Sequence, residues 1–338
     1  MNDSLVRDAG IDEMLEQLEG ELKRSVERFE PRFYAEMHSM IAYHLGWEGN
    51  AGRGKRVRPL LTLLCCQGAG GVWQAALPGA SAVELIHNFS LLHDDIQDRS
   101  ETRRGRPTVW TRWGVPQAIN TGDALFVLAH LAWGGLRSRG ASAQTTLAAQ
   151  EMLENACFRL TEGQYLDMTF ETESRVSQER YLEMIEGKTA ALLSAATGLG
   201  ACVADAAPDT IAHYAAFGRH LGLAFQILDD ILGIWGDPAV TGKPAGDDLL
   251  CRKKTLPVIL GLERSADLAR WWDAQDGALP PLGEMQAAME AEGVLEEVKA
   301  AAAVHTEKAL AALAQAAPAA PSAAQLRGLT LSLLQRDR

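Results

Sequence analysis

Apolar residues recur at helical spacing through most of this 338-residue chain, and long β-branched alternations between turn dipeptides are nearly absent. This pattern predicts an all-α fold. Several of the predicted helices are hydrophobic on more than one face, which indicates a central bundle with buried members. The predicted helices cover residues 11–29, 31–46, 55–67, 78–100, 116–137, 142–173, 177–203, 208–235, 254–264, 284–291, 293–315 and 321–335.

The composition is that of an ordinary globular protein. Hydrophobic residues make up 47% of the chain and charged residues 22%, which allows a sizeable buried core. The length fits two domains or one large one, and we predict a single all-helical domain over residues 1–338. The formal net charge of −12 argues against nucleic-acid binding, which needs a basic surface.

No feature of the sequence predicts secretion or a membrane span. Residues 1–4 are not a basic region followed by an apolar one. The uncharged run 189–204 is too short and too rich in small residues to cross a bilayer. We therefore predict a cytoplasmic protein. The number of cysteines is odd, and their spacings match no metal site. We expect them to be buried reduced thiols: Cys65, Cys66, Cys157, Cys202 and Cys251.

A first cluster of acidic residues, Asp94-Asp95 and Asp98, follows the mostly apolar run 82–93. Acidic side chains beside so much apolar sequence are costly to bury unless a cation pairs with them. On a helix, Asp94 and Asp98 share one face a turn apart, and His87 lies two turns before Asp94. Carboxylates at that spacing can bridge magnesium ions shared with substrate phosphates. The alternative is a solvated helix end whose acids pair with Arg99, Arg103 and Arg104.

A second cluster, Asp229-Asp230, follows the apolar run 221–228. Asp229 shares a helical face with Gln226, but the position one turn further on is Gly233, so this cluster offers fewer oxygens than the first. The two clusters together indicate diphosphate chemistry in an apolar pocket. Further ligands, direct or through water, could come from Asp237, Asp247 and Asp248.

Basic residues lie near both clusters of this acidic chain. Each one alone is most often a solvated surface charge. Together they suggest phosphate clamps, because Arg offers bidentate geometry to phosphate oxygens and Lys a compact charge. These residues are Lys55, Arg56 and Arg58 before an apolar helix, Arg103 and Arg104 after the first cluster, and Lys188, Lys243 and residues 252–254 further along.

These motifs, in this order, resemble those of the trans-isoprenyl diphosphate synthases, the polyprenyl synthetase family. The resemblance spans residues 54–257. It is carried by residues 54–59 (GKRVRP), by the first aspartate-rich region 84–108, by Gly163-Gln164 with Asp167, by Lys188-Thr189, and by Gln226 with Asp229-Asp230 and Gly242-Lys243. So many matches in order are highly specific.

The resemblance implies an isoprenoid-synthase-type helical bundle around a deep central cavity, usually in a homodimer. It implies three Mg²⁺ ions that grip the allylic diphosphate and are held by Asp94, Asp98 and Asp229. The same diphosphate would be bound by Arg103, Lys188 and Lys243. Isopentenyl diphosphate would be bound by Lys55, Arg58, His87 and Arg104. Thr189 and Gln226 would face the developing allylic cation with oxygen dipoles.

The implied activity is that of a short-chain trans-prenyltransferase. Its allylic substrate would be dimethylallyl, geranyl or farnesyl diphosphate. The allylic diphosphate ionises, the double bond of isopentenyl diphosphate attacks the cation, and a proton leaves to the released diphosphate. Metal ions and cationic side chains stabilise the departing charge, and the cavity must exclude water. Catalysis then rests mostly on positioning and electrostatics.

The same resemblance addresses product length, because the product grows away from the metals toward residues upstream of Asp94. In the family, a bulky residue four or five positions before that aspartate stops growth. Here these positions are Ser90 and Phe89, and the two-residue insertion of many bacterial synthases is absent. A helical wheel places Phe89 to the side, as a partial floor that favours geranylgeranyl diphosphate. Farnesyl diphosphate is the next alternative, and Phe89 as ordinary core packing stays open.

One departure from the family pattern is Gly233, where the second region commonly has a third aspartate. It gives some weight to a non-catalytic partner subunit of a heteromeric prenyl synthase. A class I terpene cyclase is a further alternative, but it would leave Lys55, Arg58 and residues 242–243 without a role. The first-region ligands and the proposed isopentenyl-binding residues are all present, which favours an active synthase.

Overall fold

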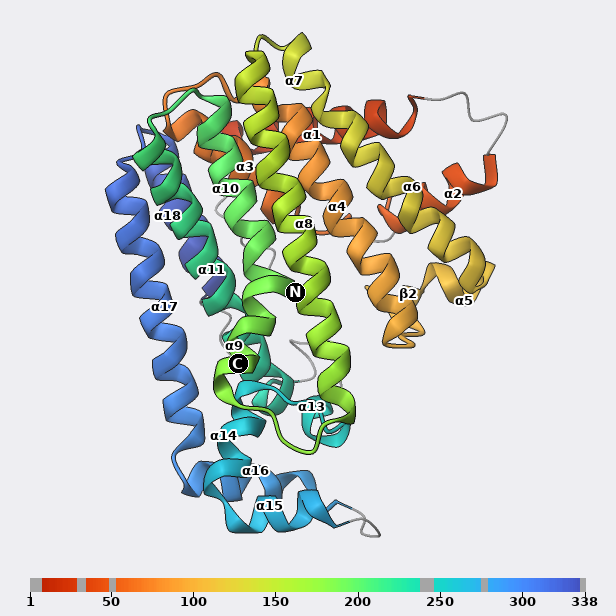
Figure 1. Ribbon diagram of the computed structural model, residues 1–338, viewed down its shortest axis with the longest axis vertical. Coiled ribbons are helices and arrows are strands. Elements are labelled where there is room, and N and C mark those ends of the chain that lie inside the picture. Colours follow the sequence, from red (N-terminus) through yellow and green to blue (C-terminus); the bar gives the residue numbers. More distant parts are fainter. Residues whose placement is uncertain (1–7, 29–34, 49–52, 238–245, 275–278, 335–338) are drawn as a thin grey trace.

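The computed structural model describes residues 8–28, 35–48, 53–237, 246–274 and 279–334, and these are almost entirely helical. Figure 1 shows long helices side by side, closed at the lower end by shorter ones. α10 packs against α3, α8 and α11 and so lies inside the bundle, while α4 packs against α6. These elements are α3 (Val57–Gly68), α4 (Leu77–Gln97), α6 (Val115–Trp133), α8 (Ala143–Thr172), α10 (Ala191–Val203) and α11 (Pro208–Trp235).

The remaining elements surround this centre. α17 (Val294–Ala316) packs along α11, as Figure 1 shows in blue at the left edge. The others are α1 (Ala9–Val26), α2 (Ala35–His44), a 3-10 helix (Trp73–Ala76), α5 (Val109–Trp113), α7 (Gly135–Ser138), α9 (Gln178–Ile185), α13 (Asp247–Leu250), α14 (Leu256–Arg264), α15 (Ala266–Asp273), α16 (Leu282–Ala291) and α18 (Ser322–Leu334).

Local sequence signals start several of these helices. Ser142, Ser177 and Ser265 are N-caps whose side chains accept a hydrogen bond from a first-turn N–H of α8, α9 and α15. Proline stands in the first turn of α4, α6, α11 and α14, where its missing N–H costs nothing. The predicted helices therefore begin within a few residues of the observed ones.

The apolar side chains form two clusters that meet along α11. Tyr214, Phe217 and Leu221 belong to the larger cluster, which also includes residues of α3, α4, α6 and α10. Ile227 and Ile234, further along the same helix, belong to a second cluster with α9, α14, α16 and α17. The all-α fold is confirmed. That residues 1–338 form a single domain stays a prediction.

Three local features differ from the expected pattern. The predicted helix 177–203 is interrupted by a π-helical turn, Glu186–Ala190, between α9 and α10. The predicted helix 78–100 ends at Gln97, and a hairpin of two short strands follows it, β1 (Thr102–Arg103) and β2 (Arg106–Pro107). The 3-10 helix, α5, α13 and α15 lie where no helix was predicted, since each has at most eight residues, too few for a clear periodic signal.

The cysteines and the membrane prediction have separate outcomes. Cys65, Cys66, Cys157 and Cys202 are buried free thiols, as predicted. The prediction is wrong for Cys251, which is exposed because it caps the short surface helix α13. No helix in the described ranges combines the length and the apolarity that a bilayer crossing requires.

Candidate functional site

The first aspartate cluster lies at the C-terminal end of α4. Asp98 is the C-cap, and its N–H donates to the carbonyl of Asp94 at 2.8 Å, so the predicted one-turn spacing holds. Asp94 is half-buried and Asp98 is exposed. Burial raises the pKa of Asp94 to about 6, with Asp98 adding to this rise and Lys188 opposing it. A bound cation would therefore stabilise the ionised forms of these two carboxylates.

Asp95 points the other way and has a different role. It is 2% exposed, and its Oδ1 accepts a hydrogen bond from Arg103 Nε at 2.8 Å. The alternative in which the cluster's acids pair with neighbouring arginines thus holds for Asp95. Because Arg103 is held by this buried carboxylate, its remaining N–H groups are presented from a fixed position.

The β1–β2 hairpin places the next arginine. Arg104 and Gly105 form its two-residue turn with φ of 52° and 73°, as a type I′ turn requires. The guanidinium of Arg104 lies against Gly54, where an added Cβ would be 2.8 Å from Nη2. Gly54 also has a φ of 77°. Close approach and backbone conformation therefore both require glycine at the start of the GKRVRP segment.

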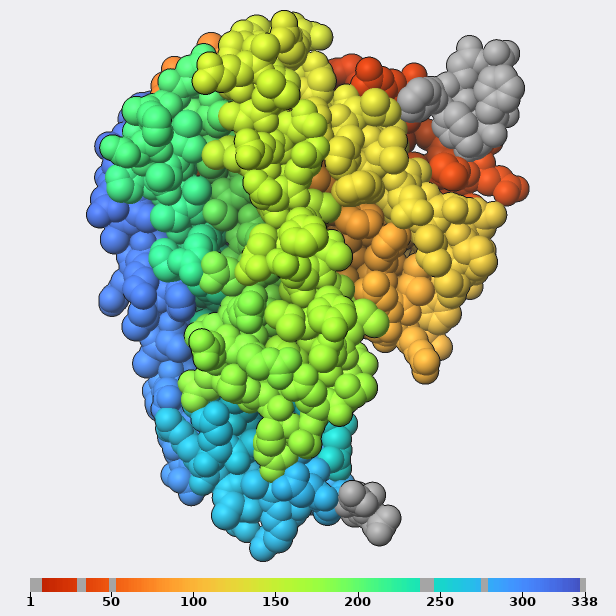
Figure 2. All heavy atoms as spheres, in the orientation of Figure 1, coloured from red at the N-terminus to blue at the C-terminus, as the bar shows by residue number. Residues whose placement is uncertain are grey.

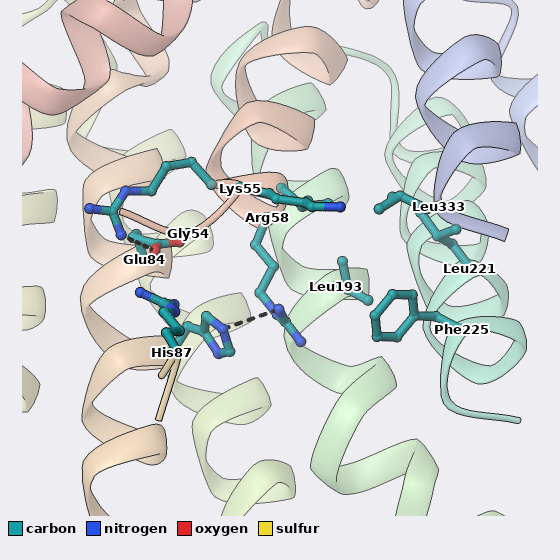
Figure 3. Close-up of a pocket in the computed structure, with 12 residues that line it drawn as sticks. Gly54, Lys55, Arg58, Glu84, His87, Leu193, Leu221, Phe225 and Leu333 are labelled. Carbon is teal, nitrogen blue, oxygen red and sulfur yellow. Dashed lines mark hydrogen bonds and ion pairs between the residues drawn. The ribbon is translucent and has the colours of Figure 1, made fainter. Parts of the chain in front are cut away.

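A cavity of about 310 Å³ brings together the residues predicted to hold isopentenyl diphosphate. Figure 3 shows Lys55, Arg58 and His87 facing an apolar wall. Arg58 Nη1 donates to His87 Nε2 at 3.3 Å. Burial lowers the pKa of His87 well below its ordinary value, and Arg58 and Arg104 add to the effect. The ring is therefore neutral. The apolar wall is made of Leu193, Leu221, Phe225 and Leu333.

Arg56, between two of the cavity residues, is structural. It is 5% exposed and donates to Glu19 at 2.7 Å, to Glu84 at 2.8 Å and to the carbonyl of Leu45 at 2.9 Å. All three basic residues of this segment line the cavity, but the guanidinium of Arg56 is committed to the ion pairs that fasten the segment to α1 and α4.

The π-helical turn sets the position of Lys188. Gly163 of α8 crosses it so closely that a Cβ would lie 2.2 Å from the backbone nitrogen of Lys188. This contact lets Lys188 Nζ donate to Asp167 at 2.5 Å. Burial favours the neutral acid, but Lys188 and Lys253 hold the pKa of Asp167 below its ordinary value. The four-residue spacing of Gly163 and Asp167 is thus explained, because Gly163 allows the close helix crossing and Asp167 forms the ion pair with Lys188.

Thr189 and Gln226 meet at a second crossing, where α11 approaches the π turn. A Cβ at Gly222 of α11 would lie 2.6 Å from the Cα of Ala190, which shows how closely α11 approaches the π turn. One turn further on, Thr189 Oγ1 donates to Gln226 Oε1 at 2.8 Å. The structure therefore joins the two residues expected to face the allylic cation. A π turn at this point is typical of functional sites.

In the second aspartate cluster, as in the first, one aspartate is accessible to solvent and its neighbour is buried. Asp229 is exposed, while Asp230 is 4% exposed. Gly233 leaves room for another acid, because a Cβ at this position would lie 2.1 Å from Asp248 Oδ2. Asp248 therefore stands where a side chain at position 233 would be. Lys243, predicted to bind the allylic diphosphate, lies outside the described residues.

Lys253 belongs to the basic run 252–254, which the sequence suggested as a phosphate clamp. Burial opposes its charge, but Asp167, Asp248, Asp230 and Asp98 together raise the pKa of Lys253. These acids come from the C-terminal end of α4 and from α8, α11 and α13, so charges of both aspartate clusters act on Lys253.

The acidic residues suit Mg²⁺ shared with phosphates. In the described part of the chain, no three His, Cys, Asp or Glu side chains converge closely enough to hold a metal by themselves. The available donors are carboxylate oxygens on two facing helices. Magnesium binds through one or two carboxylates and completes its shell with phosphate oxygens and waters. Asp94, Asp98 and Asp229 are the residues that would hold it.

Phe89 faces α6, and a second aromatic residue lies beside it. Its ring is 5.1 Å from that of Phe126 and 4.9 Å from that of His93. Ser90 is buried, and its hydroxyl donates to the carbonyl of His87. Phe126, on the neighbouring helix α6, contacts Phe89, and the role of Phe89 as a floor for the product stays a prediction. Its position in the helical repeat of α6 gave no signal of this contact.

Comparisons with known proteins agree with this geometry. A polyprenyl synthetase family model matches residues 43–275. The (2E,6E)-farnesyl diphosphate synthase of Mycobacterium tuberculosis H37Rv is 44% identical over 243 residues, which are 70% of this chain and 65% of that protein. The geranylgeranyl diphosphate synthase of the same organism is 46% identical over 68% of this chain and 67% of that protein. The match thus spans just under two thirds of the farnesyl diphosphate synthase.

Solved structures match over nearly the whole chain. The geranylgeranyl pyrophosphate synthetase of Pyrococcus horikoshii Ot3 has a TM-score of 0.88 and 32% identity, covering 97% of this chain and 98% of its own. That of Corynebacterium glutamicum, complexed with isoprenyl diphosphate and magnesium, has a TM-score of 0.82 and 30% identity, covering 97% and 99%. The motifs, the helical bundle and these matches together show that the chain belongs to the polyprenyl synthetase family.

Proposed function

We propose that this protein is a short-chain trans-prenyltransferase that condenses isopentenyl diphosphate with an allylic diphosphate, with geranylgeranyl diphosphate as its product. The observation that carries the proposal is the presence of two separate places for diphosphates. One is the cavity lined by Lys55, Arg58, His87 and Arg104. The other is the first aspartate cluster, where Asp94 and Asp98 lie one turn apart and the Lys188–Asp167 ion pair adds a cation whose charge acts on Asp94. A class I terpene cyclase would need only the second.

The first step is ionisation of the allylic substrate, which is dimethylallyl, geranyl or farnesyl diphosphate. Its C1–O bond breaks, and the diphosphate leaves with the electron pair. Three bound Mg²⁺ ions would supply charge that stabilises this leaving group. Lys188, ordered by Asp167, and Arg103, ordered by Asp95, bind its oxygens from fixed positions. Lys243 is proposed to join them.

The second step joins the two substrates. The neutral His87 ring and the Arg58 guanidinium hold isopentenyl diphosphate so that its double bond faces the allylic cation. A new carbon–carbon bond forms, the charge moves onto the isopentenyl unit, and a proton leaves to the released diphosphate. The apolar wall with Phe225 and Leu333 keeps water from the cation.

A product analysis tests the proposal. The protein is incubated with Mg²⁺, isopentenyl diphosphate and each allylic starter separately, and the dephosphorylated alcohols are sized by mass spectrometry. We expect a twenty-carbon alcohol. A fifteen-carbon alcohol would keep the prenyltransferase and make farnesyl diphosphate its product. No elongation from any starter would instead support a non-catalytic partner subunit.

We further propose that the protein acts as a homodimer in the cytoplasm. α8 runs down the middle of the face shown in Figure 2. Large apolar side chains are exposed on this helix: Leu147, Phe158, Tyr165 and Met168. Exposed apolar residues on one helix favour a protein contact. Sedimentation should give about twice the mass of the chain, and a monomer at assay concentrations would contradict the proposal.

Changing Arg58 should affect one substrate only. We expect Arg58→Gln to raise the KM for isopentenyl diphosphate by roughly 10- to 100-fold, because a charged hydrogen bond contributes about 1.5–3 kcal/mol. The KM for the allylic substrate should change little, since Arg58 lines the other cavity. Steady-state kinetics with each substrate varied in turn measures both. Arg159→Gln, which breaks an exposed ion pair on α8, is the matched control. Equal changes in both KM values would refute the assignment.

Gly233 and Asp248 should act on magnesium as one unit. Gly233→Ala displaces the Asp248 carboxylate, and Asp248→Ala removes it. We expect either change to raise the Mg²⁺ concentration for half-maximal activity about tenfold, the scale of outer-shell ligands. The double variant should be no worse than either single one. Calorimetric titration of Mg²⁺ into each variant, with an unreactive allylic diphosphate bound, compares their Mg²⁺ affinities without turnover.

Gly283→Ala is the control for the added methyl group, because a Cβ there meets no other atom within 4 Å. Effects of the Gly233 and Asp248 variants that simply add would show that the two positions act independently. If neither Gly233→Ala nor Asp248→Ala changed the Mg²⁺ requirement, Asp248 would have no part in binding magnesium at the second aspartate cluster.

A further inference from the structure

Asp230, the second residue of the second aspartate cluster, is turned into the protein and surrounded by hydrogen-bond donors. Tyr181 Oη donates to its Oδ2 at 2.5 Å, and the backbone N–H of Leu256 donates to the same oxygen at 3.3 Å. Gln226 Nε2 donates to its Oδ1 at 3.0 Å. Asp230 is 4% exposed. This residue is thus an internal anchor between α9, α11 and the start of α14.

The anchor fixes which way the Gln226 amide points. A backbone N–H can only donate, and a carboxylate can only accept once it is ionised. Burial raises the pKa of Asp230 to about 7, against the hydrogen bonds from Tyr181 and Gln226, so the ionised form prevails at pH 8. Asp230 therefore receives the NH₂ group of Gln226, and the Gln226 carbonyl oxygen must point the other way. That oxygen meets Thr189 Oγ1 at 2.8 Å, and since it can only accept, Thr189 must donate. The hydroxyl proton of Thr189 is thereby committed to Gln226.

We propose that Tyr181 and Asp230 are positioning residues that set the direction of the Gln226–Thr189 hydrogen bonds, so that oxygen lone pairs and not hydrogens face the allylic cation. This inference rests on the proposed function. Its physical basis is that a preorganised dipole stabilises a developing charge only when its favourable end is already turned toward it. Tyr181 and Asp230 touch no substrate and act through Gln226.

The Asp230→Asn variant tests direction separately from shape. The backbone N–H of Leu256 still needs an acceptor, so the new amide turns its oxygen toward Leu256 and its NH₂ group toward Gln226. Gln226 then has to present its oxygen to position 230 and its NH₂ group to Thr189. Thr189 becomes the acceptor, and its own hydrogen is released toward the cation. The side chains keep their places while the dipoles reverse.

Two measurements at pH 8 report on this reversal. We expect the kcat of Asp230→Asn to fall roughly 10²-fold, the scale for losing one preorganised dipole at a developing charge, with both KM values nearly unchanged. Binding is measured for a pair of unreactive allylic diphosphate analogues. One carries an ammonium nitrogen at the charge-bearing carbon, and the other is its neutral isostere. The preference for the ammonium analogue should fall by a similar factor, while binding of the neutral one is kept.

Two variants serve as comparisons. Tyr181→Phe leaves Asp230 its Leu256 and Gln226 donors, so its loss of ammonium preference should be small, about threefold. Adding Asp230→Asn to Thr189→Val should cost little more than Thr189→Val alone, because no hydroxyl remains to be reversed. A structural role for Asp230 would instead lower the affinity for both analogues together and lower the unfolding temperature.

If Asp230→Asn does not fold, Gln226→Leu carries the test. This variant interrupts the series of hydrogen bonds from Asp230 to Thr189 while leaving Asp230 paired with Tyr181. Its loss of ammonium preference should then equal that of Thr189→Val, and the double variant should be no worse than either. Fully additive losses would overturn the inference, as would an Asp230→Asn variant with wild-type kcat. Failure of the proposed function looks different, since the wild-type protein would then show neither turnover nor ammonium preference.

Discussion

Replacing Asp94 by alanine should lower turnover by roughly 10³-fold or more while leaving the protein folded. The reason is that several kcal/mol of charge stabilisation depend on the metal ions at this carboxylate, and each 1.36 kcal/mol is a factor of ten in rate. Asp94 is half-buried, and its raised pKa of about 6 shows that the carboxylate is poorly stabilised without a cation. Removing it therefore relieves an unfavourable charge and leaves no gap in the apolar core.

The measurement is single-turnover elongation at saturating substrates, together with a thermal unfolding curve. The unfolding temperature of Asp94→Ala should be equal to or above that of the wild type. Asp267→Ala is the control, because its carboxylate is exposed on α15 and paired with Arg270. Near wild-type turnover by Asp94→Ala would refute the metal assignment. A lowered unfolding temperature would instead show that the aspartate holds the helix end together.

Shortening Phe89 should change the product from twenty carbons to longer chains. The Phe89 ring lies against that of Phe126, so the two rings form a shared boundary between α4 and α6. Phe89→Ala opens the first part of this boundary, and we expect twenty-five-carbon products to become the largest fraction. The double variant with Phe126→Ala should extend the distribution further, because the second ring then no longer blocks the space behind it.

The product distribution is measured by mass spectrometry of the dephosphorylated alcohols at low conversion. Phe158→Ala is the matched control, since that phenylalanine is exposed on α8. It should leave the distribution unchanged. An unchanged distribution for Phe89→Ala would show that this ring is ordinary core packing and that the floor lies elsewhere. Longer products from Phe126→Ala alone would place the decisive barrier on α6.

Much of the site could be predicted because its chemistry depends on short local spacings. Asp94 and Asp98 lie one turn apart on any helix, and the apolar sequence before them makes a cation necessary. The GKRVRP segment likewise indicated phosphate-binding residues, and the structure places Arg58 at the cavity, while its binding of phosphate stays a prediction. The segment did not separate Arg56 from its neighbours, because the partners of Arg56 lie on α1 and α4. A sequence motif shows which residues are together but not which of them is buried.

Other parts of the site depend on crossings between distant helices. The closeness of Gly163 to the π turn determines the Lys188–Asp167 pair, and the approach of Gly222 to Ala190 determines the Thr189–Gln226 bond. Phe126 reaches Phe89 only because α6 packs along α4. No periodicity in one segment contains this information, since a crossing angle follows from the packing of both surfaces.

The sequence by itself determined the helical class of this protein, the positions of most helices and the family to which its motifs belong. These depend on periodicity, capping and local spacing, which act over a few residues. Only the tertiary structure decided which acidic residues are exposed and which are buried and hydrogen-bonded. It exposed Asp229 and buried Asp230, and it set Asp248 in the place left by Gly233. Burial and hydrogen-bond direction belong to the assembled bundle, because they arise only when separate helices exclude water together.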